Sequence, residues 1–136
     1  MASLVCEVLL TENPLAVSDE CLALETGAVI DFWGVVRATE EDAEISGIEY
    51  ETHHAMAEHQ LRAVADEAAG RFNLMQISIH HRTGFVPVGE ASLLVRVESR
   101  HRAEGFRAAQ WIVDELKKRA TIWKHPQFEA ATISAK

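Results

Sequence analysis

Two basic segments near the end of the sequence could bind an anion or move a proton. Lys117 opens a Lys-Lys-Arg run, and Lys124 follows seven residues later, directly after Ile122-Trp123. If this apolar pair holds the chain against the protein, Lys117 and Lys124 share one pocket. A lysine ammonium is a flexible point charge that binds phosphate, and in a pocket it also donates or accepts protons. The alternative for residues 117–119 is a helix end, where the helix dipole favours cations.

A third basic segment, Ser99-Arg100-His101-Arg102, precedes a predicted helix. Ser99 is the expected N-cap, which places residues 100–102 in the first helical turn. The positive end of a helix dipole disfavours cations. A bound anion would resolve that conflict, because free backbone N–H groups and cationic side chains can share one phosphate. Alternatively, the turn is solvated and its basic residues pair with Glu98 and Glu104.

Other common catalytic signatures are absent from the sequence. The adjacent pairs His53-His54 and His80-His81 point to opposite faces if they lie on strands, and no His-Glu-x-x-His or Cys/His spacing fits zinc. Cys6 and Cys21 form no Cys-x-x-Cys pair. There is neither a glycine-rich nucleotide loop nor a Gly-x-Ser-x-Gly segment. We therefore expect no metal site.

Composition and charge indicate one soluble domain over residues 1–136. Hydrophobic residues make up 48% of the chain, and 13 basic against 21 acidic residues give a net charge of −8. Residues 1–60 have Arg37 as their only basic residue, so the positive charge is concentrated in the second part. An acidic chain with small basic clusters and no aromatic-rich stretch argues against nucleic-acid binding.

The sequence predicts a cytoplasmic protein that does not enter a membrane. No apolar run approaches the roughly 20 residues of a membrane-spanning helix, and the N-terminus lacks the basic region of a signal peptide.

Hydrophobic spacing predicts strands and two long helices. Strands are expected at 4–10, 28–37, 45–51, 77–82 and 91–99, and a short helix at 18–24. The segment 28–37 is almost continuously apolar, which suits burial on both faces. One helical stripe runs from Ala57 to Ala68, with Gly70 as the expected C′ residue, and a second runs from Phe106 to Leu116. This order predicts an α+β fold, with a mixed, largely antiparallel sheet packed against two principal helices.

An ordered set of short segments resembles the large, catalytic subunit of molybdopterin synthase, the sulfur-inserting enzyme of molybdenum cofactor biosynthesis. The resemblance covers about residues 27–124 and leaves 125–136 as a short tail. The matching segments are Gly34-Val35-Val36-Arg37, Tyr50-Glu51, Met56-Ala57, His81-Arg82-Thr83-Gly84, Val88-Gly89-Glu90, His101-Arg102 with Phe106, Leu116-Lys117 and Ile122-Trp123-Lys124.

The resemblance implies an α/β-hammerhead fold and a homodimer. It implies that each subunit binds a small ubiquitin-like sulfur carrier, which gives a heterotetramer. The carrier's C-terminal thiocarboxylate would enter the pocket, and two sulfur transfers would convert cyclic pyranopterin monophosphate to the molybdopterin dithiolene. Neither a metal nor a cofactor is implied.

The resemblance also implies residue roles. Lys117 and Lys124 correspond to the catalytic lysines, and Arg37, His101 and Arg102 to the substrate- and phosphate-binding residues. The His-Arg pair would come from the other copy of the dimer.

Three features depart from the family pattern. Thr121 stands where the family usually has Pro, His125-Pro126 replaces a basic residue and Glu, and the tail after Phe128 is short. These departures leave both lysines in place and concern the edge that docks the carrier. The alternatives are a non-catalytic anion-binding scaffold that keeps the fold, or a different small-molecule enzyme that uses the same basic pocket.

Overall fold

The computed structural model describes residues 5–17 and 23–129. Its elements are β1 (Val5–Thr11), β2 (Ala28–Val35), β3 (Thr39–Glu40), β4 (Ala43–Thr52), α1 (His54–Phe72), β5 (Leu74–Arg82), β6 (Gly84–Pro87), β7 (Ala91–Ser99), α2 (Arg102–Arg119) and β8 (Ile122–Phe128). None of the helices described is long and apolar enough to cross a membrane.

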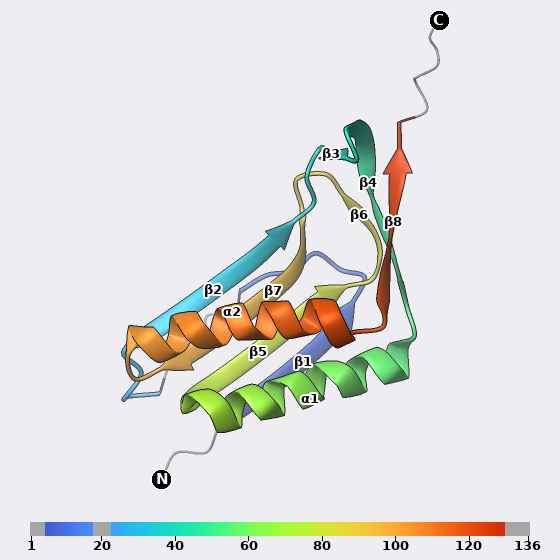
Figure 1. The fold of residues 1–136 in the computed structure, drawn as a ribbon. Coiled ribbons are helices and arrows are strands. Elements are labelled where there is room, and N and C mark those ends of the chain that lie inside the picture. Colours follow the sequence, from blue (N-terminus) through green and yellow to red (C-terminus); the bar gives the residue numbers. More distant parts are fainter. Residues whose placement is uncertain (1–4, 18–22, 130–136) are drawn as a thin grey trace, which may run out of the picture.

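A four-stranded sheet forms one layer of the fold and both helices pack on it (Figure 1). The strand order is β1-β5-β7-β2, with β1 parallel to β5 and the other pairs antiparallel. The core between sheet and helices includes Ile77 and Ile79 of β5, Val95 of β7 and Ile112 of α2. The predicted mixed, largely antiparallel sheet with two principal helices is confirmed.

A second sheet adjoins the ends of the helices. It has the order β3-β4-β6, and β8 pairs with the other side of β4. Its own small core contains Ile48, Tyr50 and Val86. Since α1 follows β4 and β8 follows α2, this sheet meets the helical layer at the start of α1 and the end of α2 (Figure 1).

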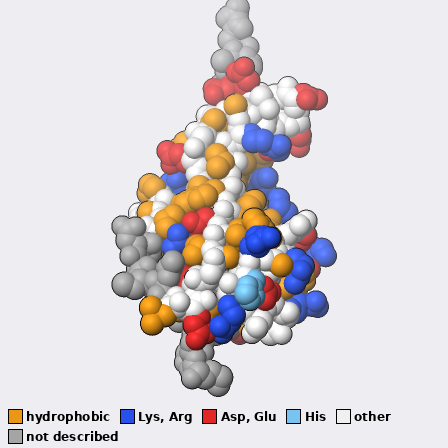
Figure 2. Space-filling view, turned by 90° about the vertical axis from the view of Figure 1, so that its left-hand side faces the viewer, with side chains coloured by type: hydrophobic (Ala, Val, Ile, Leu, Met, Phe, Trp, Pro, Cys, Tyr) orange, Lys and Arg blue, Asp and Glu red, His pale blue; other side chains and the backbone are white. Residues whose placement is uncertain are grey.

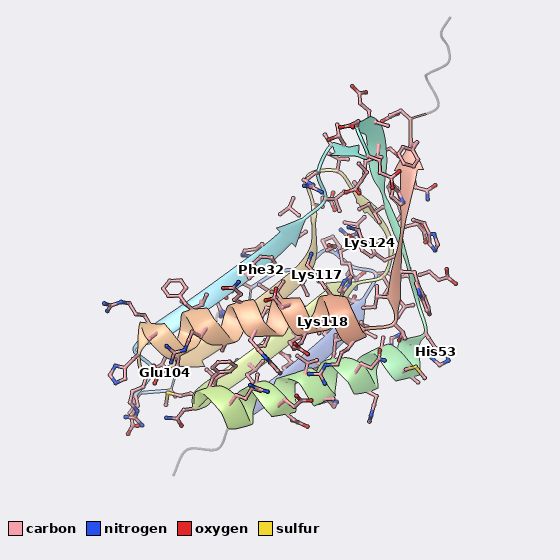
Figure 3. All side chains as sticks on the ribbon, in the orientation of Figure 1. Phe32, His53, Glu104, Lys117, Lys118 and Lys124 are labelled. Atoms are coloured by element: carbon pink, nitrogen blue, oxygen red, sulfur yellow. The ribbon has the colours of Figure 1, made fainter. Side chains whose placement is uncertain are left out.

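Helix α1 follows the predicted stripe and ends later than expected. Its buried residues are Ala57, Leu61, Val64, Ala65 and Ala68. His53 is the N-cap, with Nδ1 accepting from the Met56 backbone N–H (Figure 3). The C-cap is Asn73 in the left-handed region, at φ 55°, so the predicted end at Gly70 is wrong. Asn tolerates that conformation, whereas Gly70 lies inside the helix.

Helix α2 begins two residues later than Ser99 predicts. The N-cap is His101, and the fully buried Ser99 ends β7 and donates its hydroxyl to the His101 carbonyl at 2.6 Å. Only Arg102 of the three cations is therefore within the first turn, together with Glu104. Arg100 pairs with Glu25 rather than with Glu98 or Glu104. The N-cap prediction failed because the Ser99 hydroxyl is used to close the turn instead.

Two further expectations about burial are wrong. Strand β2 is an edge strand, so Phe32, Trp33 and Val35 are exposed rather than buried on both faces. Phe106 keeps 60% of its surface exposed, although the rest of its stripe is buried. An edge strand and the outer side of a helix lack a covering layer within one chain.

The predicted short helix at 18–24 falls mainly outside the described residues. Residues 18–22 are among those not described, while Ala23 and Leu24 are not helical.

Candidate functional site

A cavity of about 410 Å³ opens where the two sheets meet the end of α2. Its polar side chains come from several elements: Tyr50 from β4, His81 from β5, Ser92 from β7, Lys117 from α2 and Lys124 from β8. Its apolar lining includes Phe32, Leu61, Leu93, Leu116 and Ile122. None of the described residues lining it is acidic, so the cavity favours an anion.

The two predicted lysines lie at this one cavity (Figure 3). Lys117 is in the last turn of α2, directly after the buried Leu116. Lys124 is the third residue of β8 and lies opposite Tyr50 of β4 in the sheet register. Both lysines are exposed to solvent in the single chain and accessible to a ligand. The side-chain amine of neither lysine has a hydrogen bond or ion pair within the described part of the chain.

The neighbours of Lys117 have different roles. Lys118 pairs with Glu115 at 3.3 Å. Arg119 donates to Glu67 at 2.7 Å and to Glu115 at 3.1 Å. The alternative that these cations only stabilise the end of the helix therefore fits residues 118 and 119. The amine of Lys117 has no such partner and can bind a ligand.

The connection between α2 and β8 is fixed by hydrogen bonds. The backbone N–H and hydroxyl of Thr121 both donate to Oε1 of Gln60 in α1, at 2.7 and 2.9 Å. Ile122 packs against both cores. Trp123 is 48% exposed, so the expectation that an Ile-Trp pair anchors Lys124 holds for Ile122 alone.

Polar groups on the sheet side of the cavity are held in a fixed arrangement. The Tyr50 hydroxyl donates to Oγ of Ser92 at 3.1 Å, and Ser92 donates to the Gly34 carbonyl at 3.5 Å. Burial raises the pKa of Tyr50, which keeps the phenol protonated. The ring of His81 meets that of Tyr50 edge-on, with centroids 5.2 Å apart.

Arg37 does not line the cavity. It lies two residues beyond Val35, which does, and its side chain is 79% exposed. Its guanidinium is 3.4 Å from a carboxylate oxygen of Glu40. The long, exposed side chain of Arg37 leaves it available for a ligand at the rim.

His101 and Arg102 are remote from the lysines within one chain. They lie at the start of α2, and Lys117 lies in its last turn, about 22 Å away along the helix axis. Figure 3 shows this separation, because Glu104 of the first turn is at the other end of α2 from Lys117. One copy of the chain therefore brings together Lys117 and Lys124 but not His101 and Arg102.

No group of three or more potential metal ligands occurs among the residues that the structure describes. The histidine pairs have other partners: His80 contacts Glu7 at 3.2 Å, and His53 caps α1.

Comparison with known proteins decides the family. The model of the MoaE protein family matches residues 10–119. The chain belongs to the MoaE family. This match covers both helices and all of the strands except β8 and the first part of β1.

Curated relatives and a solved structure agree with the MoaE assignment. The molybdopterin synthase catalytic subunit of Thermoplasma volcanium is 33% identical over 86% of this chain and 85% of its own length. That of Emericella nidulans is 36% identical over 87% of this chain, and the match spans 60% of the Emericella subunit. Molybdopterin synthase from Staphylococcus aureus has a TM-score of 0.82 and 27% identity, with 88% and 90% of the two chains covered.

Sequence reasoning assigned no role to several residues of the cavity. Phe32, Tyr50, His81 and Ser92 line it beside the lysines. Tyr50 and His81 belong to segments that resemble the MoaE family, and this was the only signal in the sequence. Their convergence depends on the junction of two sheets, which hydrophobic spacing does not reveal.

Proposed function

We propose that this chain is the catalytic subunit of a molybdopterin synthase and transfers sulfur at the cavity lined by Lys117 and Lys124. The observation that carries the proposal is the presence of two lysines without carboxylate partners in one accessible cavity. Family membership supplies the reaction class.

The substrates proposed are two anions that meet in this cavity. One is the phosphate of cyclic pyranopterin monophosphate, and the other is the C-terminal thiocarboxylate of a small ubiquitin-like carrier. Lys117 and Lys124 offer up to six N–H donors, which suits both anions. They also move protons as the thiocarboxylate sulfur bonds to the pterin side chain and the phosphate ester opens, after which water cleaves the acyl–sulfur bond, leaving the sulfur on the pterin and a carboxylate on the carrier. The sulfur arrives already activated on the carrier.

A second copy of the chain completes the proposed site. Arg37 reaches the substrate from the rim of its own cavity, whereas His101 and Arg102 come from the partner copy. The side chains of His101 and Arg102 have no ion pair or hydrogen bond in the described part of the chain, and no side chain caps α2. The start of α2 is thus suited to an incoming phosphate.

Exposed apolar residues provide a surface for that second copy. Phe32, Trp33 and Val35 on β2 and Phe106 on α2 are exposed. Figure 2 shows hydrophobic side chains in a band along one face, with basic side chains beside it. Such a surface favours an isologous dimer, and two carriers would then make a heterotetramer.

Two expectations stay as predictions beside this proposal. One is that the chain, 1–136, forms a single domain, and the other is that the protein works in the cytoplasm.

Alanine variants of the two lysines test the proposal. Conversion of cyclic pyranopterin monophosphate is measured with a thiocarboxylated carrier, and product is quantified by mass spectrometry. We expect Lys117→Ala and Lys124→Ala each to lower turnover by about a hundredfold or more. Lys118→Ala is the matched control, since Lys118 pairs with Glu115 and does not line the cavity.

The outcomes separate the enzyme from a scaffold. Undiminished turnover in a folded Lys117→Ala protein would remove the catalytic assignment. Absence of any turnover by the unmodified protein with carrier and substrate would favour an anion-binding scaffold.

A further inference from the structure

His81 is one of two titratable side chains at the cavity, with Tyr50, that the proposed reaction does not use. It is next to last in β5 and lines the cavity together with Tyr50, Lys117 and Lys124. Its neighbour His80 contacts Glu7 and does not line this cavity. Because successive side chains of a strand point to opposite faces, His81 lies at the cavity and His80 lies on the other face of β5.

The hydrogen bonding of His81 fixes its tautomer. Nδ1 lies 2.7 Å from the Arg82 carbonyl oxygen, which can only accept, so Nδ1 holds a proton and donates it. Burial lowers the pKa of His81, and the ring is therefore neutral near pH 7. Nε2 then has a free lone pair, and it has no partner in the described part of the chain.

The orientation of the ring is also fixed. Tyr50 packs edge-on against it. Arg82, whose carbonyl holds Nδ1, is itself anchored by Glu90 at 2.7 Å and by the Glu12 carbonyl at 3.3 Å. A ring restrained by these contacts loses little conformational entropy when its Nε2 accepts a hydrogen bond from a ligand.

The other polar side chains of the cavity do not offer the same chemistry. Charged lysine amines only donate hydrogen bonds. The Tyr50 hydroxyl donates its proton to Ser92 and Ser92 to the Gly34 carbonyl; their oxygens can still accept, but a hydroxyl oxygen is a weaker acceptor than a neutral imidazole nitrogen. His81 is thus an uncharged side-chain acceptor near the two cationic groups. An occupant with both an anionic group and N–H donors would match this arrangement.

We propose that Nε2 of His81 accepts a hydrogen bond from an N–H group of the pterin ring and so positions the substrate while the lysines bind its phosphate. The inference rests on the proposed function, which supplies the pterin. A pterin ring carries ring N–H and amino donors, and its flat face suits a cavity lined by Phe32 and Tyr50.

Two amide variants separate the two nitrogens of the ring. The amide of His81→Asn lies where Nδ1 is, so it keeps a donor for the Arg82 carbonyl and loses the acceptor at the position of Nε2. The longer His81→Gln restores a polar group at that position. The probe is pterin itself, without phosphate, titrated into the full chain and followed by its fluorescence. We expect about tenfold weaker binding for His81→Asn and recovery to within about threefold for His81→Gln.

Inorganic phosphate provides the matched second probe. We expect its affinity to be unchanged by His81→Asn and lowered by Lys117→Ala, whereas Lys118→Ala, at a residue outside the cavity lining, leaves the affinity for pterin unchanged. Equal loss of pterin binding in the Asn and Gln variants, or unchanged binding in His81→Asn, would overturn the inference. So would failure of the unmodified protein to bind pterin.

A third experiment changes the ligand instead of the protein, so it does not depend on the folding of the variants. Pterin methylated at its donor nitrogens should bind the unmodified protein about tenfold more weakly than pterin, and equal affinity would contradict the inference.

Turnover with carrier and substrate is measured separately. If the unmodified protein binds pterin but transfers no sulfur, the proposed function fails and the assignment of His81 stands. In an active enzyme, His81→Asn should raise the KM for the pterin more than it lowers kcat. A rise in the KM for the carrier alone would instead assign His81 to the carrier's tail and overturn the inference.

Discussion

The guanidinium of Arg82 donates to the carboxylate of Glu90 at 2.7 Å, although the Arg82 side chain is only 8% exposed. This ion pair joins the end of β5 to the turn that precedes β7. The backbone carbonyl of the same Arg82 accepts the hydrogen bond from Nδ1 of His81. Stability and the geometry of the cavity are therefore connected through Arg82.

Removal of Glu90 should destabilise the protein because it leaves a buried charge without its partner. We expect Glu90→Ala to lower the free energy of unfolding by about 2–3 kcal/mol, below the full cost of a buried pair since Glu90 is half exposed. Glu58→Ala breaks the exposed Arg62–Glu58 pair and should cost less than about 0.5 kcal/mol. Urea unfolding of both variants measures the difference, and equal values would contradict this account of Arg82.

Mixed dimers should reveal whether a site is built from two copies of the chain. In the proposed arrangement, Lys117 of one copy acts with Arg102 of the other. Lys117→Ala and Arg102→Ala chains, each inactive alone, would then form mixed dimers with one intact site and one doubly altered site. Random pairing should restore about a quarter of normal turnover.

The measurement is turnover after co-expression of the two variant chains with distinguishable tags. Mixed dimers of Lys117→Ala with Lys124→Ala are the control, because both residues line the same cavity of one copy. If that control recovers equally, or if the Lys117 and Arg102 variants do not complement each other, the shared site is wrong.

The buried His81 should make the protein less stable in mild acid. Its pKa is lowered in the folded state from an ordinary value of 6.5, so as pH falls below about 6.5 the unfolded chain takes up a proton before the folded chain does. The free energy of unfolding therefore decreases towards lower pH, by at most about 1.4 kcal/mol per pH unit.

His81→Gln removes this contribution. Urea unfolding between pH 7.5 and 5.5 should show a shallower pH dependence in the variant than in the unmodified protein. Tyr50, Arg82, Lys117 and Lys124 are present in both chains, so their contributions largely cancel. Parallel curves would show that His81 takes up a proton equally in both states.

Two helical glycines should respond oppositely to alanine. A Cβ atom at Gly105 in α2 would lie 2.9 Å from Oγ of Ser99 and 3.0 Å from Ile30, so Gly105→Ala should destabilise the protein by about 1–3 kcal/mol. A Cβ at Gly70 in α1 meets nothing within 4 Å, so Gly70→Ala should stabilise it by about 0.5–1 kcal/mol. Thermal unfolding compares the two: an unchanged or higher stability of Gly105→Ala would contradict the close packing at Ser99, and destabilisation by Gly70→Ala would contradict the open space at Gly70.

Much of the fold could be predicted from hydrophobic spacing because its core elements are regular. The buried stripe of α1 from Ala57 to Ala68 and the strand that ends at Ser99 were both predicted. The errors arise where tertiary structure overrides local preference. Ser99 is used in a turn rather than as a cap, and the apolar β2 lies at a sheet edge.

The candidate site was only partly predictable. The spacing of Lys117 and Lys124 across a helix end suggested a shared pocket, and the structure places both at one cavity. The pairing of Lys118 and Arg119 with Glu115 follows from their spacing on one helix, but the sequence could not show that Arg119 also pairs with Glu67, because that contact depends on how α2 packs beside α1.

Because the connection between α2 and β8 is short, the position of Lys124 depends on the number of residues in this connection as well as on their types. Only Ala120 and Thr121 separate the two elements, and Gln60 holds Thr121 where the family pattern has a proline that could not donate. Because neighbouring strand residues face opposite ways, a single insertion here would turn the amine of Lys124 away from Lys117. Length changes in this segment should thus abolish the proposed sulfur transfer even when every charged group is retained.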